Sequence, residues 1–310
     1  MKFTGCWLGV FLVWTSSAWG QVTVEVTQDQ QQFLPGEALK AAVRITNLSG
    51  QDLHLGGEED WLSFAIESRD GTVVSKMGDA PIQGAFVLES SKVAIKRVDL
   101  APYFVLALPG NYQIVATVHI SDWNRDITSP GRSFDLIEGS KLWEQDVGVP
   151  RTAGTTDSAP EMRRYILQQA NYLKGRIRLY LRVTDMYGKP VRVLAVGPMV
   201  SFSRPEPQVD RASNLHVLYQ DGPFSFNYTV CNLQGEVIKR QTYDYTGGSR
   251  PRLRTDDDGN ISVFGGVRHV AATDIPPPKQ DDLSDAEPAV SANTNPAQAT
   301  NQLSVVKPGR

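Results

Sequence analysis

The densest acidic cluster in this 310-residue chain is the segment DDDGN, Asp256 to Asn260. Asp256, Asp258 and Asn260 stand at alternate positions, as the first ligands of a calcium loop do. Such a loop also needs a later bidentate glutamate, whereas this segment continues with ISVF. Asp-Gly is equally the usual chemistry of a hairpin turn. A calcium site and a turn both stay open, and the sequence favours the turn.

The segment SDWNRD places Asp122 and Asp126 beside Trp123 at the end of a predicted strand. Two carboxylates that flank a cleft can perform acid and base catalysis on a glycosidic bond, so this segment could be half of a sugar-binding or glycosidase site. No second carboxylate is identifiable as its counterpart. The sequence favours a polar turn at a strand end.

The remaining reactive side chains have no catalytic or metal-binding spacing. The histidines, His54, His119, His216 and His269, form neither HxH nor HExxH. His119 and His216 alternate with apolar residues and are expected to be solvated. Cys231 lacks a Cys/His motif and is interpreted as a half-buried small side chain. The sequence therefore predicts no catalytic, cofactor-binding or metal-binding residue.

The predicted strands that carry some of these residues belong to a β-unit that is repeated once in the sequence. Tyr180–Val193 aligns with Asn227–Arg240 at an offset of 47, which is 227 minus 180, and Gly188 falls over Gly235 in the turn. Further on, SRPEPQVDRASN aligns with SRPRLRTDDDGN. A period in the forties is typical of four-stranded propeller blades. Residues 162–273 are predicted to form a propeller-type antiparallel β-meander.

Alternation predicts one dry and one wet face for the sheet in this half. The wet positions are Arg182, Arg192, His216 and Lys239, and the dry positions are Val183, Val193, Val217 and Val237. Acidic residues fall in the turns that flank the strands: Asp185, Asp210, Asp221, Asp244 and Asp256 to Asp258. Residues 162–176 fit a helix or a strand, and the repeat favours the strand.

The first half, residues 21–138, alternates in short segments with a turn between each. Its expected core faces are Val22, Val24, Val26; Leu39, Ala41, Val43, Ile45; Leu53, Leu55; Leu62, Phe64, Ile66; Tyr112, Ile114, Ala116, Val118, Ile120; Phe134, Leu136. The Pro-Gly-x-Tyr entry to Tyr112 resembles the tyrosine corner of immunoglobulin-like domains. The segment FLPGEALKAAVRITNLSG resembles the opening strands of bacterial immunoglobulin-like and macroglobulin-like modules. The resemblance implies an immunoglobulin-like β-sandwich.

Composition marks three segments outside these domains. Residues 1–20 place Lys2 before a short apolar run and end in small residues, which is typical of a signal peptide and too short for a bilayer span. Residues 139–161, rich in Gly, Thr, Ser and Pro, are the predicted interdomain connection. Residues 274–310 nearly lack aromatic residues and are predicted to be a disordered tail.

The expected function follows from export and from charge balance. With 31 basic and 34 acidic residues, the chain has no excess positive charge for a nucleic-acid backbone. We expect a secreted or periplasmic protein, without membrane insertion after signal removal, that is a non-catalytic binding or structural module of the cell envelope or extracellular space. Its partner would be a protein or a glycan, with self-association as a further expectation. The alternative is a secreted, carboxylate-dependent, carbohydrate-active hydrolase.

Overall fold

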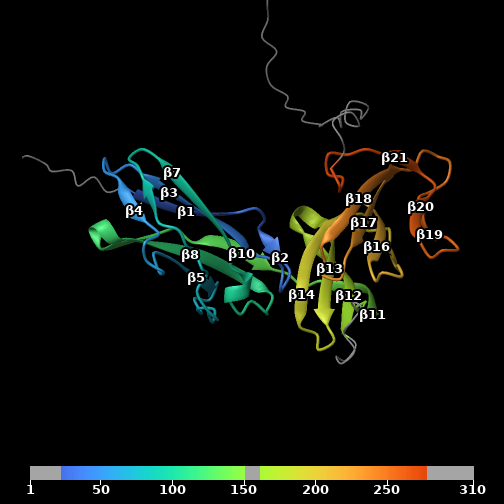
Figure 1. Ribbon diagram of the computed structural model, residues 1–310, viewed down its shortest axis with the longest axis horizontal. Helices are drawn as coiled ribbons and strands as arrows, with labels where there is room; N and C mark the ends of the chain where they lie inside the picture. The colour runs from blue at the N-terminus through green and yellow to red at the C-terminus, as the bar shows by residue number, and fades with distance from the viewer. Residues whose placement is uncertain (1–21, 151–160, 278–310) are drawn as a thin grey trace, which may run out of the picture.

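The computed structural model describes residues 22–150 and 161–277. The described chain is all-β, as predicted, with three short 3-10 turns as its helical elements. Figure 1 shows the two halves side by side, β1 to β10 in one and β11 to β21 in the other. The predicted signal peptide, residues 151–160 of the predicted connection and residues 278–310 of the predicted tail lie outside the described residues.

The first half contains three sheets. One has the order β1 (Val22–Gln28), β3 (Lys40–Asn47), β7 (Val93–Asp99). The second has the order β2 (Gln32–Phe33), β10 (Arg132–Leu136), β8 (Gly110–Ile120), β5 (Leu62–Ser68), with β9 (Arg125–Thr128) paired to β8. A short pair joins β4 (Leu53–Leu55) to β6 (Phe86–Leu88).

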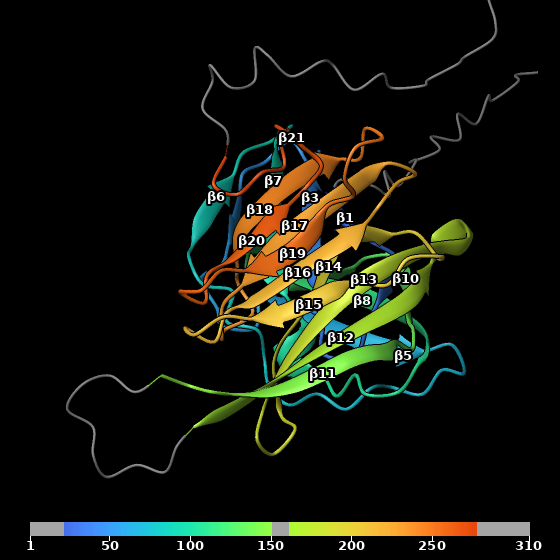
Figure 2. The ribbon, with the colours of Figure 1, turned by 90° about the vertical axis from the view of Figure 1, so that its right-hand side faces the viewer.

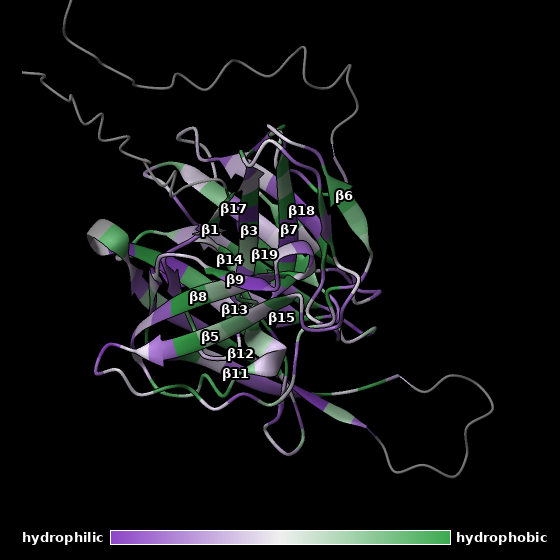
Figure 3. Ribbon diagram, turned by 90° about the vertical axis from the view of Figure 1, so that its left-hand side faces the viewer, coloured by the Kyte–Doolittle hydropathy of each residue, from purple (hydrophilic) through white to green (hydrophobic). Residues whose placement is uncertain are grey.

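The alternation in the sequence correctly locates the core of this half. All the residues expected on its core faces are buried except Tyr112, which is half-buried and packs against the same cluster. Figure 3 shows apolar residues along β5 and β8, which carry two of these faces. The hydroxyl of Tyr112 donates a hydrogen bond to the carbonyl of Leu108 at 2.8 Å, so it ties β8 to the preceding loop.

The second half contains two larger sheets and a hairpin. The first sheet has the order β11 (Ser140–Gly148), β12 (Met162–Tyr172), β13 (Arg176–Asp185), β14 (Pro190–Met199). The second has the order β15 (Glu206–Val209), β16 (Leu215–Gln220), β17 (Ser225–Cys231), β18 (Val237–Asp244), β21 (Val267–His269). The hairpin pairs β19 (Arg252–Thr255) with β20 (Ile261–Phe264).

One segment settles a choice that the sequence left open, and another changes a predicted boundary. Residues 162–172 form a strand, which confirms the favoured alternative. The predicted connection contains β11, whose pairing with β12 shifts register between Lys141 and Trp143. A bulge of this kind interrupts alternation, because one strand carries an extra residue. β11 also lies at the edge of its sheet with Val147 as its buried residue, so its apolar pattern is weak.

The aligned turns of the second half have the same hydrogen bonds. Gly188 and Gly235 have φ of 82° and 71°, in the left-handed region that glycine adopts without strain. Each donates its amide to the carbonyl three residues earlier, Asp185 at 3.1 Å and Asn232 at 2.9 Å. The first aligned block therefore folds as two equivalent hairpins.

The second aligned block also folds as two hairpins with matching turns. Asp210 Oδ1 accepts the amide of Asn214 at 2.8 Å, and Asp256 Oδ1 accepts the amide of Asn260 at 2.7 Å. These are side-chain caps of the kind that aspartate supplies in turns. The first of these turns joins β15 to β16 and the second joins β19 to β20.

Each of the two large sheets of the second half has a buried inner face and an outer face that is covered in part. They pack on each other through Tyr165, Leu181, Val217 and neighbouring buried residues. The β19–β20 hairpin covers the outer face of β16 to β18 (Figure 2), where Leu253 and Val263 pack on buried Leu218 and Tyr228. On the other side, Leu34 of the first half packs against buried Tyr180 and Val193.

Because other segments pack on these sheets, the prediction of a solvent-exposed face is wrong at two positions. His216 is buried and Arg182 is half-buried, because the hairpin lies over one and the first half lies over the other. Arg192 and Lys239 are exposed as expected. Among the expected dry positions, Val183, Val193 and Val217 are buried, and Val237 is half-buried.

The last described residues of the chain pair with β18. Ile275 exchanges backbone hydrogen bonds with Arg240, at 2.8 and 3.1 Å. Asp274 is 5% exposed and forms an ion pair with Arg268. The first residues of the segment predicted as a tail are thus packed on the second half.

Candidate functional site

Asp256, Asp258 and Asn260 form a turn. The carboxylate of Asp256 accepts hydrogen bonds from the amide and from Nδ2 of Asn260, at 2.7 and 3.1 Å. These bonds hold the pKa of Asp256 below its usual range. Within residues 22–150 and 161–277, no three His, Cys, Asp or Glu side chains gather as a metal-ligand set.

Asp122 and Asp126 are each bound to a different histidine. Asp122 Oδ2 accepts the backbone amide of His54 at 2.9 Å and contacts its Nδ1 at 3.1 Å. Asp126 Oδ1 contacts Nδ1 of His119 at 2.7 Å. Trp123 between them is half-buried and packs against the core of the first half. The motif is a polar strand-end turn, as the sequence favours.

The structure reveals a pattern that the sequence does not show: every histidine contacts an aspartate. The other two pairs are His216 with Asp210 at 3.1 Å and His269 with Asp244 at 3.0 Å. The partners come from different strands or loops, and His54 and Asp122 are 68 residues apart. Sequence spacing finds no common pattern among these pairs, because their separations range from six residues for Asp210 and His216 to 68 for His54 and Asp122.

The His119 pair predicts a pH dependence of stability. The hydrogen bond to Asp126 raises the pKa of His119, and the charges of Asp126, Glu58 and Asp60 act in the same direction. A raised folded pKa means that the stabilisation is fully present below the ordinary pKa of 6.5 and is lost as pH rises through the folded value. We expect His119→Gln to reduce the pH dependence of the unfolding free energy between about pH 6 and 8. Urea unfolding at several pH values measures this dependence. An unchanged slope would contradict this.

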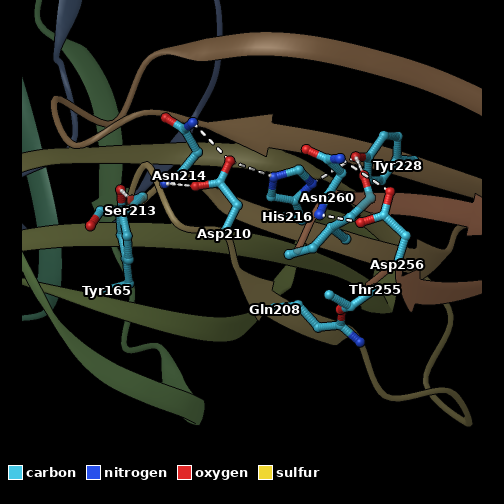
Figure 4. Close-up of polar contacts among 11 residues, drawn as sticks. Tyr165, Gln208, Asp210, Ser213, Asn214, His216, Tyr228, Thr255, Asp256 and Asn260 are labelled. Atoms are coloured by element: carbon cyan, nitrogen blue, oxygen red, sulfur yellow. Dashed lines mark hydrogen bonds and ion pairs between the residues drawn. The ribbon is translucent and has the colours of Figure 1, made fainter. Parts of the chain in front are cut away.

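Asp210, His216 and Tyr228 form a buried polar network (Figure 4). His216 is 7% exposed, its Nε2 lies 3.1 Å from Asp210 Oδ2, and its Nδ1 lies 2.7 Å from the hydroxyl of Tyr228. The hydroxyl also lies 3.3 Å from the carbonyl of Ile261. A neutral ring donates to Asp210 and accepts from Tyr228. A protonated ring donates to both, and the hydroxyl then donates to Ile261.

The ionisation states in this network fit a structural role. Burial would raise the pKa of Asp210, but hydrogen bonds from Asn214 and His216 outweigh it and lower the pKa. Burial raises the pKa of Tyr228 to about 12. At neutral pH Asp210 is a carboxylate and Tyr228 is a neutral phenol, and each lies within hydrogen-bond distance of His216. The network joins the β15–β16 turn to β16, β17 and β20 instead of presenting a free nucleophile.

Cys231 is fully buried, and burial raises the pKa of its thiol to about 12. A thiol in this state has almost no thiolate at neutral pH, and the thiolate is the reactive form. The sequence predicts a half-buried small side chain, whereas the structure buries Cys231 completely in the core between the two large sheets.

Three exposed phenylalanines mark one end of the second half. Phe202, Phe224 and Phe264 are 77%, 65% and 59% exposed. They lie where β14, β16 and β20 end, and we call this surface the aromatic end. Backbone hydrogen bonds interlock its loops: Val200 with Gln220 at 3.0 Å, Tyr245 with Phe224 at 2.7 Å and Gly266 with Ser249 at 2.8 Å.

Arginines border these rings. The guanidinium of Arg254 lies 5.5 Å from the ring centre of Phe264, and that of Arg250 lies 5.1 Å from the ring centre of buried Phe226. Arg250 also donates to Ser203 Oγ at 3.4 Å, which connects it to the Phe202 loop. The aromatic end thus combines exposed rings with exposed cations on loops that are fixed at their bases.

The chain matches no protein-family model and no curated protein. Among solved structures it is similar to Spo0M, a sporulation control protein from Bacillus subtilis, at 8% sequence identity. That likeness covers 57% of this chain and 89% of the other, with a TM-score of 0.28, and carries no argument about function. No helix of the described residues is long and apolar enough to cross a membrane.

Proposed function

We propose that this chain is a non-catalytic, exported binding module of the cell envelope or extracellular space, and that it holds its partner at the aromatic end. The observation that carries the proposal is the exposure of Phe202, Phe224 and Phe264 on one set of interlocked loops. Exposed large apolar groups that gather on one surface are typical of interaction sites. The partner is a protein or a glycan, and self-association through the same surface is a further form of this proposal.

The composition of the aromatic end supports a binding role. Aromatic residues and arginine dominate the binding energy of interfaces. Phe224 also packs near Tyr245, with ring centres 6.5 Å apart. Rings held by fixed loops lose little conformational entropy on binding, which favours affinity.

The use of the aspartates in this half supports binding over hydrolysis. Asp185 and Asp210 accept backbone amides within their own turns, as Asp256 does. A glycosidase needs two carboxylates that face a cleft, one of them with a raised pKa. The pKa values of Asp210 and Asp256 are lowered.

The proposal includes a finer account of the architecture. The Tyr112 to Leu108 hydrogen bond supports an immunoglobulin-like first half, and the two pairs of matching turns support propeller-like repeats in the second. Export would rest on residues 1–20 acting as a signal peptide.

The test is a Phe202→Ser, Phe224→Ser, Phe264→Ser variant, compared with Tyr187→Ser. Tyr187 is 86% exposed in the β13–β14 turn, at the opposite end of the strands, and serves as the matched control. We expect the triple variant to lose binding on a glycan array or to purified envelope proteins, or to lose self-association in sedimentation. Tyr187→Ser should retain it. Equal binding by both variants would overturn the assignment of the surface.

Hydrolysis is measured on the same samples with glycoside, ester and peptide substrates. We expect no turnover. Turnover that Asp210→Asn or Asp256→Asn abolishes would instead support the carboxylate-dependent hydrolase.

A further inference from the structure

A cavity of about 370 Å³ lies between the two halves of the chain. Its walls include Phe33, Leu39, Phe104 and Leu136 of the first half's core, while Arg182 and Pro190 come from the second half. Pockets for small molecules have volumes of roughly 300–1,000 Å³ and mostly apolar walls with few polar groups. The cavity has the size and lining of a small-molecule site.

Two charged groups line this wall, Arg182 and Glu37. Arg182 is half-buried on β13, where Nη2 donates to the carbonyl of Pro35 at 2.8 Å and Nε donates to Gln168 Oε1 at 3.3 Å. Both acceptors are neutral. Among the described residues no carboxylate lies within ion-pair distance of this guanidinium, and burial lowers its pKa. A cation withdrawn from water in this way is stabilised by an anion.

The other ionisable group of the wall, Glu37, is satisfied within the protein. Its Oε1 accepts Gln30 Nε2 at 2.8 Å and its Oε2 accepts the amide of Leu34 at 2.9 Å. Burial raises the pKa of Glu37, whereas these two hydrogen bonds and the charge of Arg178 oppose that shift. Glu37 therefore holds the Leu34–Glu37 turn in place, and it has the charge of Arg178 acting on it, whereas no carboxylate acts on Arg182 in this way.

We infer that this cavity binds a small amphiphile with one anionic head group, the head on Arg182 and the apolar body against Leu106 and Pro190. Carboxylate and sulfate heads share the chemistry that a guanidinium recognises, because both accept hydrogen bonds from its planar donors. This site is separate from the aromatic end and does not depend on the function proposed for that surface.

Calorimetric titration of the full chain tests the inference with four probes of one chain length below their micelle-forming concentrations. Decanoate and decyl sulfate carry anionic heads, decanol a neutral head and decylamine a cationic head. We expect saturable binding of one or both anionic probes, and the difference between them identifies the preferred head. Decanol should bind at least about tenfold more weakly, since it lacks the charge-assisted hydrogen bonds.

Variants locate the binding. Arg182→Gln should weaken the anionic probes at least about tenfold and leave decanol unchanged, whereas Arg182→Lys should retain most of the affinity because it keeps the charge. Ala107→Trp, at the exposed rim of the cavity, should block all the probes. Arg192→Gln is the matched control, because Arg192 is exposed on the neighbouring strand β14 and absent from the cavity wall.

Each contrary result overturns the inference. Tighter binding of decylamine than of decanoate would assign the cavity to Glu37 and a cation. Unchanged decanoate binding by Ala107→Trp would place the probe elsewhere. Absence of saturable binding by every probe, in a chain whose melting temperature shows that it is folded, would remove the site.

Discussion

Replacing Asp210 with alanine should lower the free energy of unfolding by about 2–4 kcal/mol, because it leaves His216 buried without its carboxylate. Asp210 also accepts the amide and Nδ2 of Asn214, at 2.8 and 3.0 Å. All three donors lose their partner together. Urea unfolding at pH 7 measures the loss.

Asp256→Ala is the matched control for this change. Asp256 makes the same pair of bonds to Asn260 but has no histidine partner and is exposed. We therefore expect a smaller loss, and the difference between the two variants reports the contact with His216. Equal losses would show that the turn, and not the buried network, holds this region.

The effect of Asp210 has a defined pH window. Its folded pKa is depressed, so the stabilisation is present above the ordinary value of 3.8 and is lost as pH falls through the folded pKa. In the Asp210→Ala variant this acid-sensitive part should disappear. A wild-type protein whose stability is flat below pH 5 would contradict the depressed pKa.

Replacing Gly235 with alanine should destabilise the protein by about 2–4 kcal/mol, and the aligned Gly188→Ala by about 1–2 kcal/mol. Both residues have positive φ, which costs any residue with a Cβ some strain. A Cβ at Gly188 meets no atom within 4 Å. A Cβ at Gly235 lies 3.1 Å from side-chain atoms of Val183 and Arg192, so crowding adds to the strain.

Thermal and urea unfolding of the two variants measure this difference. Arg192→Ala in the Gly235→Ala background should recover little of the loss, since alanine keeps the Arg192 Cβ 3.1 Å away and removes only the Cδ at 3.2 Å. Equal effects of the two glycine substitutions would mean that the hairpins share their surroundings as well as their turn geometry. The structure gives them the same turn and different neighbours.

The sequence predicts the fold best where a sheet has one buried face. In β1 and β3 the apolar residues alternate with polar ones and are buried as expected, because one side of the sheet meets the core. The aligned turns are also readable, since glycine and Asx residues act locally. Local chemistry of this kind needs no knowledge of distant segments.

The sequence fails where two distant segments cover one strand. Every residue of β16 is buried, so alternation does not separate a wet face from a dry face there. The cover over His216 lies in the β19–β20 hairpin, and the acceptor for Arg182 is Pro35, 147 residues away. The cavity and the aromatic end likewise depend on tertiary packing, so their residues carry no motif.

The strand order of the two halves has a consequence for how they fold. In the second half β11 to β14 and β15 to β18 each pair with the next strand in sequence, mostly through short turns. In the first half, Gln32 on β2 pairs with Asp135 on β10, and β5 pairs with β8 across two intervening strands. Chains with local contacts close smaller loops and fold faster. We expect the second half to form first during refolding and to present the surface of Tyr180 and Val193 on which Leu34 then docks.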